Sequence, residues 1–438
     1  MSGDDLFVHD FREAAPYIDY LRGKTLVIGV ASNLVSGQPL AALATDLTLL
    51  ASLGVHLVLI HGSRQQISEL SNAAGHEPEY HNGRRITDNA TLTLAKQACG
   101  LVRFNIEAAL SVGIAHSPQR GKYLRIASGN YVSARPLGVS NGIDMGYTGR
   151  VRKVDSEAIQ QRLDDGALVL ISPLGHSLSG KTFNLSMADL AEAVAISLKA
   201  EKLIFIINQE GILDEKDALI SNLSAKEAQQ RIENDSVHVA QRRILKAAIN
   251  AVENDVQRTH VLSGLQDGGI IRELFTRNGV GTSVAKAPFM NIRQAHSGDI
   301  PDIMSLIRPL EDEGILLPRS REYLDSHIHE FSVLEHDRQI YGCVALKIFT
   351  ESKAAELACL VVAKHAQDGG YGKLLLEDVL NEAQKHGLDM LFALSTRTGE
   401  WFLERNFQSA EVAQLPLGRQ QEYHDSGRCS KIFMLPLG

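Results

Sequence analysis

A stretch in the last third of the chain joins a predicted strand, a glycine-rich loop and the start of a helix. Apolar and β-branched residues between Ala354 and Val362 predict a buried strand. The segment Gln-Asp-Gly-Gly-Tyr-Gly at 367–372 then breaks the strand, and apolar residues recur at helical spacing from Leu375 to Ala383. Such a loop lets backbone N–H groups and a helix N-terminus approach a phosphate, although an ordinary glycine turn before a surface helix is the alternative.

The loop follows the pattern Q-x-x-G-x-G, which is carried by Gln367, Gly370 and Gly372. This pattern resembles the acyl-CoA motif of the GCN5-related N-acetyltransferases, and it lacks the first glycine and the longer βαβ context of a dinucleotide fingerprint. The resemblance implies acetyl-CoA as the cosubstrate and no metal. It assigns the binding of that molecule to Leu360, Val361, Val362, Gln367, Asp368, Gly369, Gly370, Tyr371, Gly372 and Lys373.

Length and composition limit the classes of protein to which the chain can belong. A chain of 438 residues is expected to form two or three domains, and its net charge of −8 argues against a nucleic-acid partner. No apolar run has the length of a membrane span, and the first residues lack the basic start of a signal peptide. The four cysteines have no metal-ligand spacing and indicate reduced thiols, so we expect a cytoplasmic protein with no metal and no membrane partner.

The first two-thirds of the chain alternate predicted strands with predicted helices. Apolar runs predict buried strands at 24–31, 55–60, 167–172 and 202–207. Amphipathic or apolar segments predict helices at 14–22, 40–53 and 187–200. This alternation predicts an open α/β sheet whose functional loops follow the carboxyl ends of the strands.

Several separate segments resemble the amino-acid kinase family, and most closely acetylglutamate kinase. The matching segments are Pro16-Tyr-Ile18, Arg22-Gly-Lys-Thr25, Arg85-Ile-Thr-Asp88, Leu198-Lys-Ala-Glu-Lys-Leu-Ile204 and the segment 273–282. The resemblance spans roughly residues 14–285, and it implies an open, mostly parallel αβα sandwich.

Three departures from the kinase pattern predict that this domain is catalytically degenerate. After the first strand the kinases carry a lysine and two glycines for the ATP phosphates, where this chain reads Gly-Val-Ala-Ser at 29–32. After the second strand they carry three glycines, where this chain has Gly62-Ser63-Arg64, and Ala188 stands in place of an aspartate that organises catalysis. Because phosphoryl transfer depends on positioned charge around the phosphates, we expect no kinase activity.

The kinase resemblance implies a sensor for L-arginine. In arginine-sensitive relatives the effector lies between the N-terminal helix and the last segments of the domain. The corresponding residues here are Tyr17, Lys202, Glu273, Gly279 and Gly281. A carboxylate such as that of Glu273 can pair with a guanidinium in a bidentate fork, and the alternative is a solvated helix glutamate followed by a plain glycine turn. The family also implies a homo-oligomer, a hexamer interlaced through the N-terminal helix.

The last third of the chain follows the order of elements of an acetyltransferase domain. The segment from Phe402 to Phe407 resembles the late aromatic-x-x-x-Gly-Phe pattern of that family. Asn406 replaces the glycine, which is tolerated because asparagine visits the left-handed region. We therefore expect an amino-acid kinase-like domain at 1–286, a linker at 287–291 and a mixed-sheet α+β acetyltransferase domain at 292–438.

An acetyltransferase domain joined to a degenerate acetylglutamate-kinase-like domain resembles the bacterial N-acetylglutamate synthase family. The resemblance implies acetyl transfer from acetyl-CoA to the α-amino group of L-glutamate, the first step of arginine synthesis, with feedback inhibition by L-arginine. One alternative is a protein lysine acetyltransferase regulated by an amino acid, although two suitably placed arginines favour a small diacid. Another is a non-catalytic arginine sensor, which the intact phosphate loop disfavours.

The residues of the reaction are assigned from its chemistry and from this resemblance. Glu356, on the central strand, is the predicted general base for the ammonium proton, against the alternative of a solvent-facing glutamate. Ser395 is the predicted proton donor to the departing thiolate, because the next helix offers Trp401 and Phe402 in place of a tyrosine. The diacid is assigned to Leu317, Arg319, Cys359, Arg428 and Ser430, with one carboxylate at each arginine unless these are surface arginines. Cys359 is expected to be a small strand residue rather than a covalent acetyl carrier.

Overall fold

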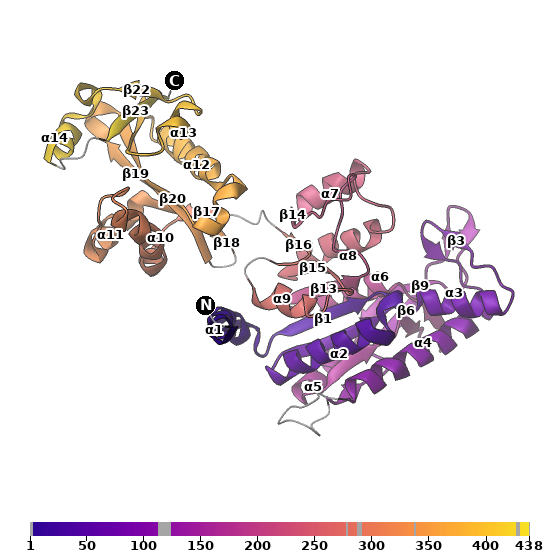
Figure 1. The fold of residues 1–438 in the computed structure, drawn as a ribbon. Helices are drawn as coiled ribbons and strands as arrows, with labels where there is room; N and C mark the ends of the chain where they lie inside the picture. Colours follow the sequence, from indigo (N-terminus) through magenta and orange to yellow (C-terminus); the bar gives the residue numbers. More distant parts are fainter. Residues whose placement is uncertain are drawn as a thin grey trace. The chain divides into compact units, whose positions relative to one another are not determined.

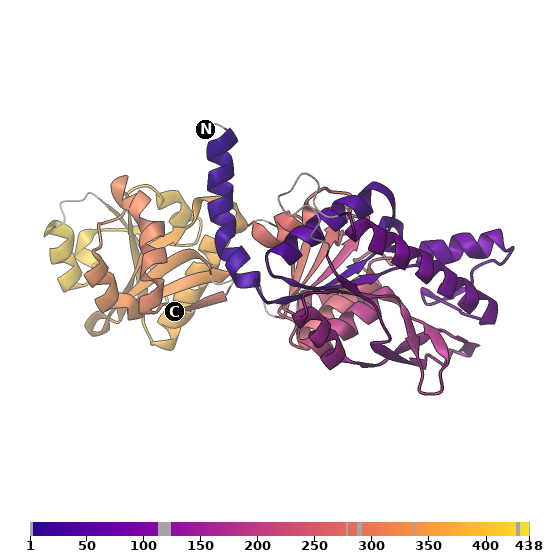
Figure 2. The same ribbon diagram turned by 90° about the horizontal axis from the view of Figure 1, so that it is seen from below.

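The computed structural model describes residues 3–112, 124–276, 279–286, 291–336, 339–425 and 430–437. The chain divides into two compact units, Met1–Pro288 and Phe289–Gly438, each with its own central sheet (Figures 1 and 2). In the described part of the chain, no helix is long and apolar enough to cross a lipid bilayer. The same residues contain no group of three or more histidine, cysteine, aspartate or glutamate side chains arranged to hold a metal ion.

The core of the first unit is an eight-stranded sheet in which neighbouring strands are parallel, apart from the antiparallel pair β15 and β16. Across the sheet the strands are β14 (Asn222–Ser224), β16 (Thr282–Ala285), β15 (Arg258–Ser263), β13 (Lys202–Ile207), β1 (Thr25–Val30), β2 (His56–His61), β10 (Leu168–Ile171) and β5 (Ile126–Ala127). Four of them are the predicted apolar runs, and their residues are almost all buried, as expected where helices cover both faces. The predicted open, mostly parallel sheet is therefore confirmed.

Helices cover both faces of this sheet, which makes the unit an αβα sandwich (Figure 1). Successive strand residues point to opposite faces, so Val27 joins one hydrophobic cluster and Ile28 joins the other. The first cluster includes α5 (Ser156–Asp164), α6 (Met187–Leu198), α7 (Ala225–Glu233) and α8 (Arg242–Glu253). The second includes α1 (Gly3–Leu21), α2 (Gly37–Ser52), α4 (Asn89–Leu110) and α9 (Gly269–Phe275).

Short strands that the sequence does not predict complete the first unit. A four-stranded sheet has the order β12 (Thr182–Asn184), β11 (Leu174–His176), β6 (Val132–Pro136) and β9 (Gly149–Val154). Two strand pairs are β3 (Tyr80–His81) with β4 (Arg84–Arg85) and β7 (Val139–Ser140) with β8 (Ile143–Asp144). The helix α3 (Arg64–Ala73) follows β2. Most of these strands have two or three residues, which is too short to show a pattern, and the longer β6 and β9 contain no continuous apolar run.

The N-terminal helix is longer than predicted. It begins at Gly3 rather than near residue 14, and Phe7 and Phe11 on its first turns are exposed. Its last turns pack on the unit through Tyr17 and the buried Leu21. Phe7 and Phe11 are therefore not buried on this unit, whereas the predicted part of the helix contributes the buried Leu21.

The second unit contains a seven-stranded mixed sheet. Across the sheet the strands are β17 (Asn291–Gln294), β18 (Phe331–His336), β19 (Gln339–Phe349), β20 (Ala354–Val362), β21 (Met390–Ser395), β23 (Lys431–Pro436) and β22 (Gln408–Ala410). Among these, β20 and β21 are parallel, and the other neighbours are antiparallel. The helices are α10 (Ile300–Asp312), α11 (Arg321–His327), α12 (Tyr371–Lys385), α13 (Gly399–Leu403) and α14 (Leu417–Asp425).

The predicted mixed α+β fold of the second unit is confirmed, with two local findings. The helix α13 ends at Leu403, before the turn that carries Asn406. Asn406 adopts the predicted left-handed conformation, with φ of 67°. The helix α12 packs in one hydrophobic cluster and α10 in another, so both faces of the sheet are covered.

A buried histidine ends β2 of the first unit. His61 is fully buried, with Nδ1 3.2 Å from the Gly62 carbonyl oxygen and Nε2 2.9 Å from the Ser172 hydroxyl oxygen. Burial lowers the pKa of His61 to about 4. In the unfolded chain the imidazole has its ordinary, higher pKa, so it takes up a proton before the folded protein does as the pH falls. Acidification therefore favours the unfolded state.

We expect the free energy of unfolding to fall by about 2 kcal/mol between pH 7 and pH 5 because of His61 alone. Stability from this residue is present at neutral pH and is lost as the pH falls from the ordinary value of the histidine pKa toward about 4. In the variant His61→Gln, this part of the decrease in the free energy of unfolding should be absent. Urea unfolding followed by circular dichroism at both pH values measures the difference, and an equal loss in parent and variant would contradict the assignment.

Candidate active site and candidate effector site

The central strands of the second unit separate where the sequence predicts the acetyl site. Within the described residues, β20 pairs with β21 as far as Leu357, although both strands continue beyond this point. A bulge against β19 follows, where Cys359 has φ of +51°. The edge of β20 that carries Leu360, Val361 and Val362 is thereby left open to an extended ligand, which can pair with it as an added strand.

The glycine-rich loop joins the end of β20 to α12. It is not a plain loop, because Lys364–Gly369 forms a 3-10 helix, and Gly370 then takes the left-handed conformation (φ 72°) that favours glycine. The helix α12 begins at Tyr371 after Gly370, which has no side chain to cap it, and the Lys373 N–H donates to the Gly370 carbonyl oxygen at 3.1 Å. Gln367 donates to the Val362 carbonyl oxygen at 3.3 Å and ties the loop to the strand. This arrangement suits a phosphate.

The remaining residues assigned to the cosubstrate belong to the same loop. Asp368 and Gly369 lie in the 3-10 helix, and Gly372 and Lys373 lie on the first turn of α12. A methyl group on Gly372 would approach the Trp401 ring to 3.4 Å, so little space separates the loop from α13. All ten assigned residues therefore lie on one strand edge and the loop that follows it.

Glu356 is buried on β20 and pairs with an arginine from α14. The Arg419 guanidinium donates to both carboxylate oxygens, from Nε to Oε2 at 2.6 Å and from Nη2 to Oε1 at 3.1 Å. The exposed fractions are 7% for Glu356 and 8% for Arg419, so the alternative of a solvent-facing glutamate is wrong. The fork fixes the direction of the carboxylate oxygens and stabilises their charge, while each oxygen keeps a lone pair that can accept a proton.

Arg319 and Glu356 both lie close enough to the Cys359 thiol for their charges to affect its pKa. Burial raises the pKa of the Cys359 thiol to about 11, with the Arg319 charge opposing the rise and the Glu356 charge adding to it. A thiol with this pKa is protonated at neutral pH and is a poor nucleophile. Arg319 Nη1 also donates to the carbonyl oxygen of the partly exposed Leu317 at 3.2 Å. The fold thus gathers Leu317, Arg319, Glu356 and Cys359 in one region.

The predicted proton donor Ser395 ends β21 and is partly exposed. Its hydroxyl oxygen lies 2.7 Å from the Thr398 hydroxyl and accepts from the Thr398 backbone N–H at 2.9 Å. Ser430 precedes β23, and its carbonyl oxygen accepts from the Tyr423 hydroxyl at 2.8 Å. Arg428 lies outside the described residues. The roles of these residues stay predictions.

The residues assigned to arginine sensing meet around a buried histidine of the first unit. Glu273, on α9, accepts from His260 Nδ1 at 2.6 Å and from the backbone N–H groups of Val280 and Gly281 at 2.6 and 3.3 Å. The Lys202 ammonium lies 3.2 Å from His260 Nε2. One chain of contacts therefore links β13, β15, α9 and the loop before β16.

The charges in this chain of contacts are set by burial and by neighbouring groups. Burial lowers the pKa of His260, and the Lys202 charge lowers it further, against the effect of Glu273. Burial alone would raise the pKa of Glu273, but hydrogen bonds from His260 and two backbone groups lower it to about 2. At neutral pH a neutral His260 accordingly donates to a charged Glu273 and accepts from the Lys202 ammonium.

Two glycines and a tyrosine complete the candidate effector site. A methyl group on Gly279 would collide with the Glu273 carboxylate, and one on Gly281 would collide with the Val261 carbonyl oxygen. Tyr17 packs on the same hydrophobic cluster as Ile270 of α9, so the last turns of α1 lie beside α9. The alternative of a solvated glutamate before a plain turn is wrong, although the sensing role of the site stays a prediction.

Sequence reasoning missed two residues that organise these sites. Arg419 lies 63 positions from its partner Glu356, in a polar segment with no motif. His260 lies 13 positions from Glu273, inside a buried strand that mixes polar and apolar residues. Lys202 of β13 pairs in register with Arg258 of the adjacent parallel strand β15, and His260 lies two residues further along that strand.

Comparison with known families matches both units of the chain. Residues 24–263 match the amino acid kinase family, and residues 300–400 match the acetyltransferase (GNAT) family. The chain is 50% identical to an amino-acid acetyltransferase from Neisseria meningitidis serogroup B over 434 residues, which are 99% of each chain. It is 41% identical to an amino-acid acetyltransferase from Shewanella oneidensis over 434 residues, which are 98% of this chain and 97% of that protein.

Solved structures agree with these matches. The N-acetylglutamate synthase of Neisseria gonorrhoeae, complexed with coenzyme A and L-arginine, is 48% identical and superposes with a TM-score of 0.91. That match covers 98% of this chain and 99% of the other. The same enzyme complexed with coenzyme A and N-acetyl-glutamate is 49% identical, with a TM-score of 0.64 and 99% coverage of both chains.

Proposed function

The chain belongs to the amino-acid acetyltransferase family, and on this premise we propose that it transfers the acetyl group of acetyl-CoA to the α-amino group of L-glutamate. The products are N-acetylglutamate and free coenzyme A. The observation that carries the proposal is the buried carboxylate of Glu356 beside the open edge of β20, in a unit whose glycine-rich loop suits a phosphate. The Neisseria gonorrhoeae synthase, which matches over the full chain, binds coenzyme A together with N-acetyl-glutamate.

The reaction needs a neutral amine and a proton for the departing sulfur. Glu356 takes a proton from the substrate ammonium, directly or through a water molecule, and the amine then attacks the thioester carbonyl carbon. The new C–N bond forms, the nitrogen of the tetrahedral intermediate gives up its second proton to solvent, the intermediate collapses, and the C–S bond breaks. Ser395 delivers a proton to the thiolate from the end of β21, where Thr398 orients its hydroxyl, and takes a replacement proton from water.

Both substrates are placed by groups that suit their charges. The pantetheine arm of acetyl-CoA pairs with β20 at Leu360 and Val362, and the pyrophosphate lies at the N-terminus of α12. The two carboxylates of glutamate are shared between Arg319 and Arg428, because a guanidinium binds a carboxylate through two parallel hydrogen bonds. The Cys359 backbone and Ser430 complete the diacid site.

The first unit serves as an allosteric sensor of L-arginine and has no kinase activity. Glu273 binds the effector guanidinium, with Lys202, Gly279, Gly281 and Tyr17 around it. Arginine inhibits by favouring one of two arrangements of the chain through differential contacts. We also propose that the protein acts in the cytoplasm and assembles as a hexamer through α1, whose exposed Phe7 and Phe11 offer an apolar surface.

Thiol release from acetyl-CoA, measured with L-glutamate and with or without L-arginine, tests the proposal. We expect release that depends on glutamate and is suppressed by arginine. Thiol release that depends on glutamate but is not inhibited by arginine would support the synthase activity and contradict the arginine-sensing role of the first unit. Release with a lysine peptide in place of glutamate would indicate a protein lysine acetyltransferase, and no release with any acceptor would indicate a non-catalytic sensor.

A further inference from the structure

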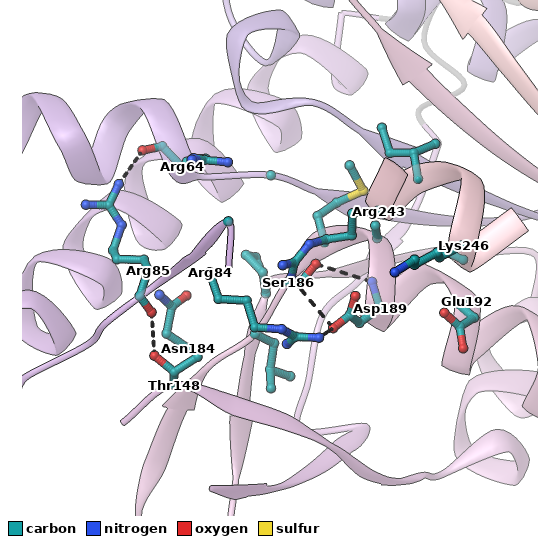
Figure 3. Close-up of a pocket in the computed structure, with 18 of the residues that line it drawn as sticks. Arg64, Arg84, Arg85, Thr148, Asn184, Ser186, Asp189, Glu192, Arg243 and Lys246 are labelled. Carbon is teal, nitrogen blue, oxygen red and sulfur yellow. Dashed lines mark hydrogen bonds and ion pairs between the residues drawn. The ribbon is translucent and has the colours of Figure 1, made fainter. Parts of the chain in front are cut away.

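A large pocket of the first unit shares no lining residue with either site described above. It encloses about 1460 Å³ where the loops after β1 and β2 face α6 and α8 (Figure 3). In parallel α/β sheets, ligands bind in such crevices at the carboxyl ends of the strands. The departures from the kinase pattern at residues 29–32, 62–64 and 188 lie at this place, so the pocket has lost the groups expected for phosphoryl transfer.

The loops that would hold a nucleotide through their backbone are packed against each other. The Ser32 hydroxyl accepts from the Gln65 backbone N–H at 3.1 Å, and the Gly62 backbone N–H donates to the Val30 carbonyl oxygen at 2.7 Å. A methyl group on Gly62 would come within 2.9 Å of the Ser32 nitrogen. Both of these N–H groups are already bonded within the protein, so neither is free for a ligand.

Positive charge dominates the lining of the pocket. Among the described residues, its arginines are Arg64, Arg84, Arg85, Arg150, Arg242 and Arg243. Lys246 adds a further cation, and the acidic lining residues are Asp189 and Glu192. Asp189 is occupied by the Arg84 guanidinium at 2.6 Å, and burial raises the pKa of Glu192 to about 7, so Glu192 is only partly charged at neutral pH. This excess of positive charge disfavours a cationic ligand and favours an anion with several charges.

In the part of the chain that the structure describes, two of these cations, Arg64 and Arg85, lie against an aromatic ring rather than beside a carboxylate. The guanidinium carbons of Arg64 and Arg85 lie 4.6 and 4.9 Å from the centre of the same Tyr80 ring. Arg85 is 7% exposed, and its Nη2 donates to the Arg64 carbonyl oxygen at 3.1 Å and to the Ser68 hydroxyl at 2.6 Å. Its Nη1 has no hydrogen-bond partner within the described part of the chain. Neither of the two hydrogen bonds that Arg85 donates through Nη2 goes to a carboxylate, so its positive charge adds to that of the pocket.

We propose that this pocket binds a small anion with two or more negative charges, held by guanidinium groups of its arginines. Arg64 supplies a side chain where the kinase resemblance places a glycine, and Arg150 and Arg243 reach the pocket from β9 and α8. Carboxylates and phosphates both match the guanidinium fork, so oxyanions are the shared chemistry of a polycarboxylate and a phosphorylated ligand. The proposal does not rest on acetyl transfer, because it concerns binding to the first unit alone.

Isothermal titration of the full-length protein with citrate and with pyrophosphate, at constant ionic strength and without acetyl-CoA, tests this inference. We expect at least one of the two anions to bind, and its dissociation constant to rise about tenfold or more in Arg150→Gln and in Arg243→Gln, since each removes a charge-assisted contact. Arg150 is exposed and has no role in packing the core, so its variant should fold. The control is Arg162→Gln, an exposed arginine on α5 outside the pocket, which should bind as the parent does.

The two probes also separate the sources of the ligand. Binding of citrate alone would indicate a polycarboxylate, binding of pyrophosphate alone a phosphorylated ligand, and binding of both recognition of oxyanions in general; each result supports the site. Failure of both anions to bind at millimolar concentrations would overturn the proposal. Binding that is equally strong in the Arg150 and Arg243 variants would overturn it as well, because the anion would then lie elsewhere.

Discussion

Glu356→Gln is expected to lower kcat by about 10²- to 10⁴-fold, the range that a positioned general base contributes. The amide keeps the size of the side chain but cannot accept the ammonium proton. It also turns an NH₂ group toward the Arg419 guanidinium in place of a carboxylate oxygen, which removes one half of the fork. Initial rates of glutamate-dependent thiol release, with both substrates near saturation, measure the loss.

The matched control for this variant is Glu422→Gln. Glu422 lies on the same helix as Arg419, 3.5 Å from its Nη1, but its side chain is 52% exposed and it also pairs with Lys347 at 2.9 Å. An exposed ion pair contributes little, so this variant should keep kcat within about twofold of the parent. If Glu356→Gln retained full turnover across neutral pH, the carboxylate would be a structural partner of Arg419 and the base would lie elsewhere.

The sequence predicted those parts of the fold that depend on local pattern. Continuous apolar runs such as Lys202–Ile207 identify strands covered on both faces, and their alternation with helices leaves few arrangements of the sheet. The glycine pattern at 367–372 predicts an anion-binding turn, because a residue at positive φ such as Gly370 favours glycine. In each case the signal lies within a few neighbouring residues.

The sequence did not predict features that depend on partners brought together by the fold. Glu356 pairs with Arg419, and Glu273 pairs with His260, and these partners determine the hydrogen bonds of each carboxylate. Nothing in the sequence around any of the four residues indicates which residue it pairs with. The 3-10 helix at Lys364–Gly369 was likewise expected to be a loop, since six residues give little helical periodicity. Electrostatic arguments about these sites were therefore incomplete until the fold was known.

The same reasoning explains why the basic pocket was not anticipated. Its arginines come from α3, β4, β9 and α8, and each one alone reads as a surface residue. The sequence showed only that kinase groups were replaced at Gly62-Ser63-Arg64 and Ala188. What replaces them becomes visible when the strands place the guanidinium groups around one cavity.

In Glu273→Gln we expect the arginine concentration that gives half inhibition to rise by at least about 30-fold, because a buried carboxylate paired with a guanidinium is removed. Turnover without arginine should remain measurable, since Glu273 belongs to the first unit. Inhibition curves of thiol release measure the half-inhibitory arginine concentration, and calorimetric titration measures the affinity for arginine. Glu253→Gln, at the exposed end of α8, is the control and should keep the parent response.

A second variant separates loss of the effector contact from damage to the fold. Glu273 accepts hydrogen bonds from His260, Val280 and Gly281, so its amide variant could disturb the loop before β16. Lys202→Gln lies one contact further away, beyond His260, and removes a positive charge on β13. Should both variants bind arginine as tightly as the parent, the effector site would have to lie elsewhere in the chain.

The pH dependence of inhibition distinguishes how arginine uses the carboxylate. Burial holds the pKa of His260 below its ordinary range, and the pKa of Glu273 is about 2, so neither group changes charge near neutral pH. The half-inhibitory arginine concentration should therefore stay constant within about twofold between pH 7 and pH 8. A steep change over that range would mean that binding protonates or deprotonates His260, so that arginine displaces the imidazole from Glu273 rather than sharing the carboxylate with it.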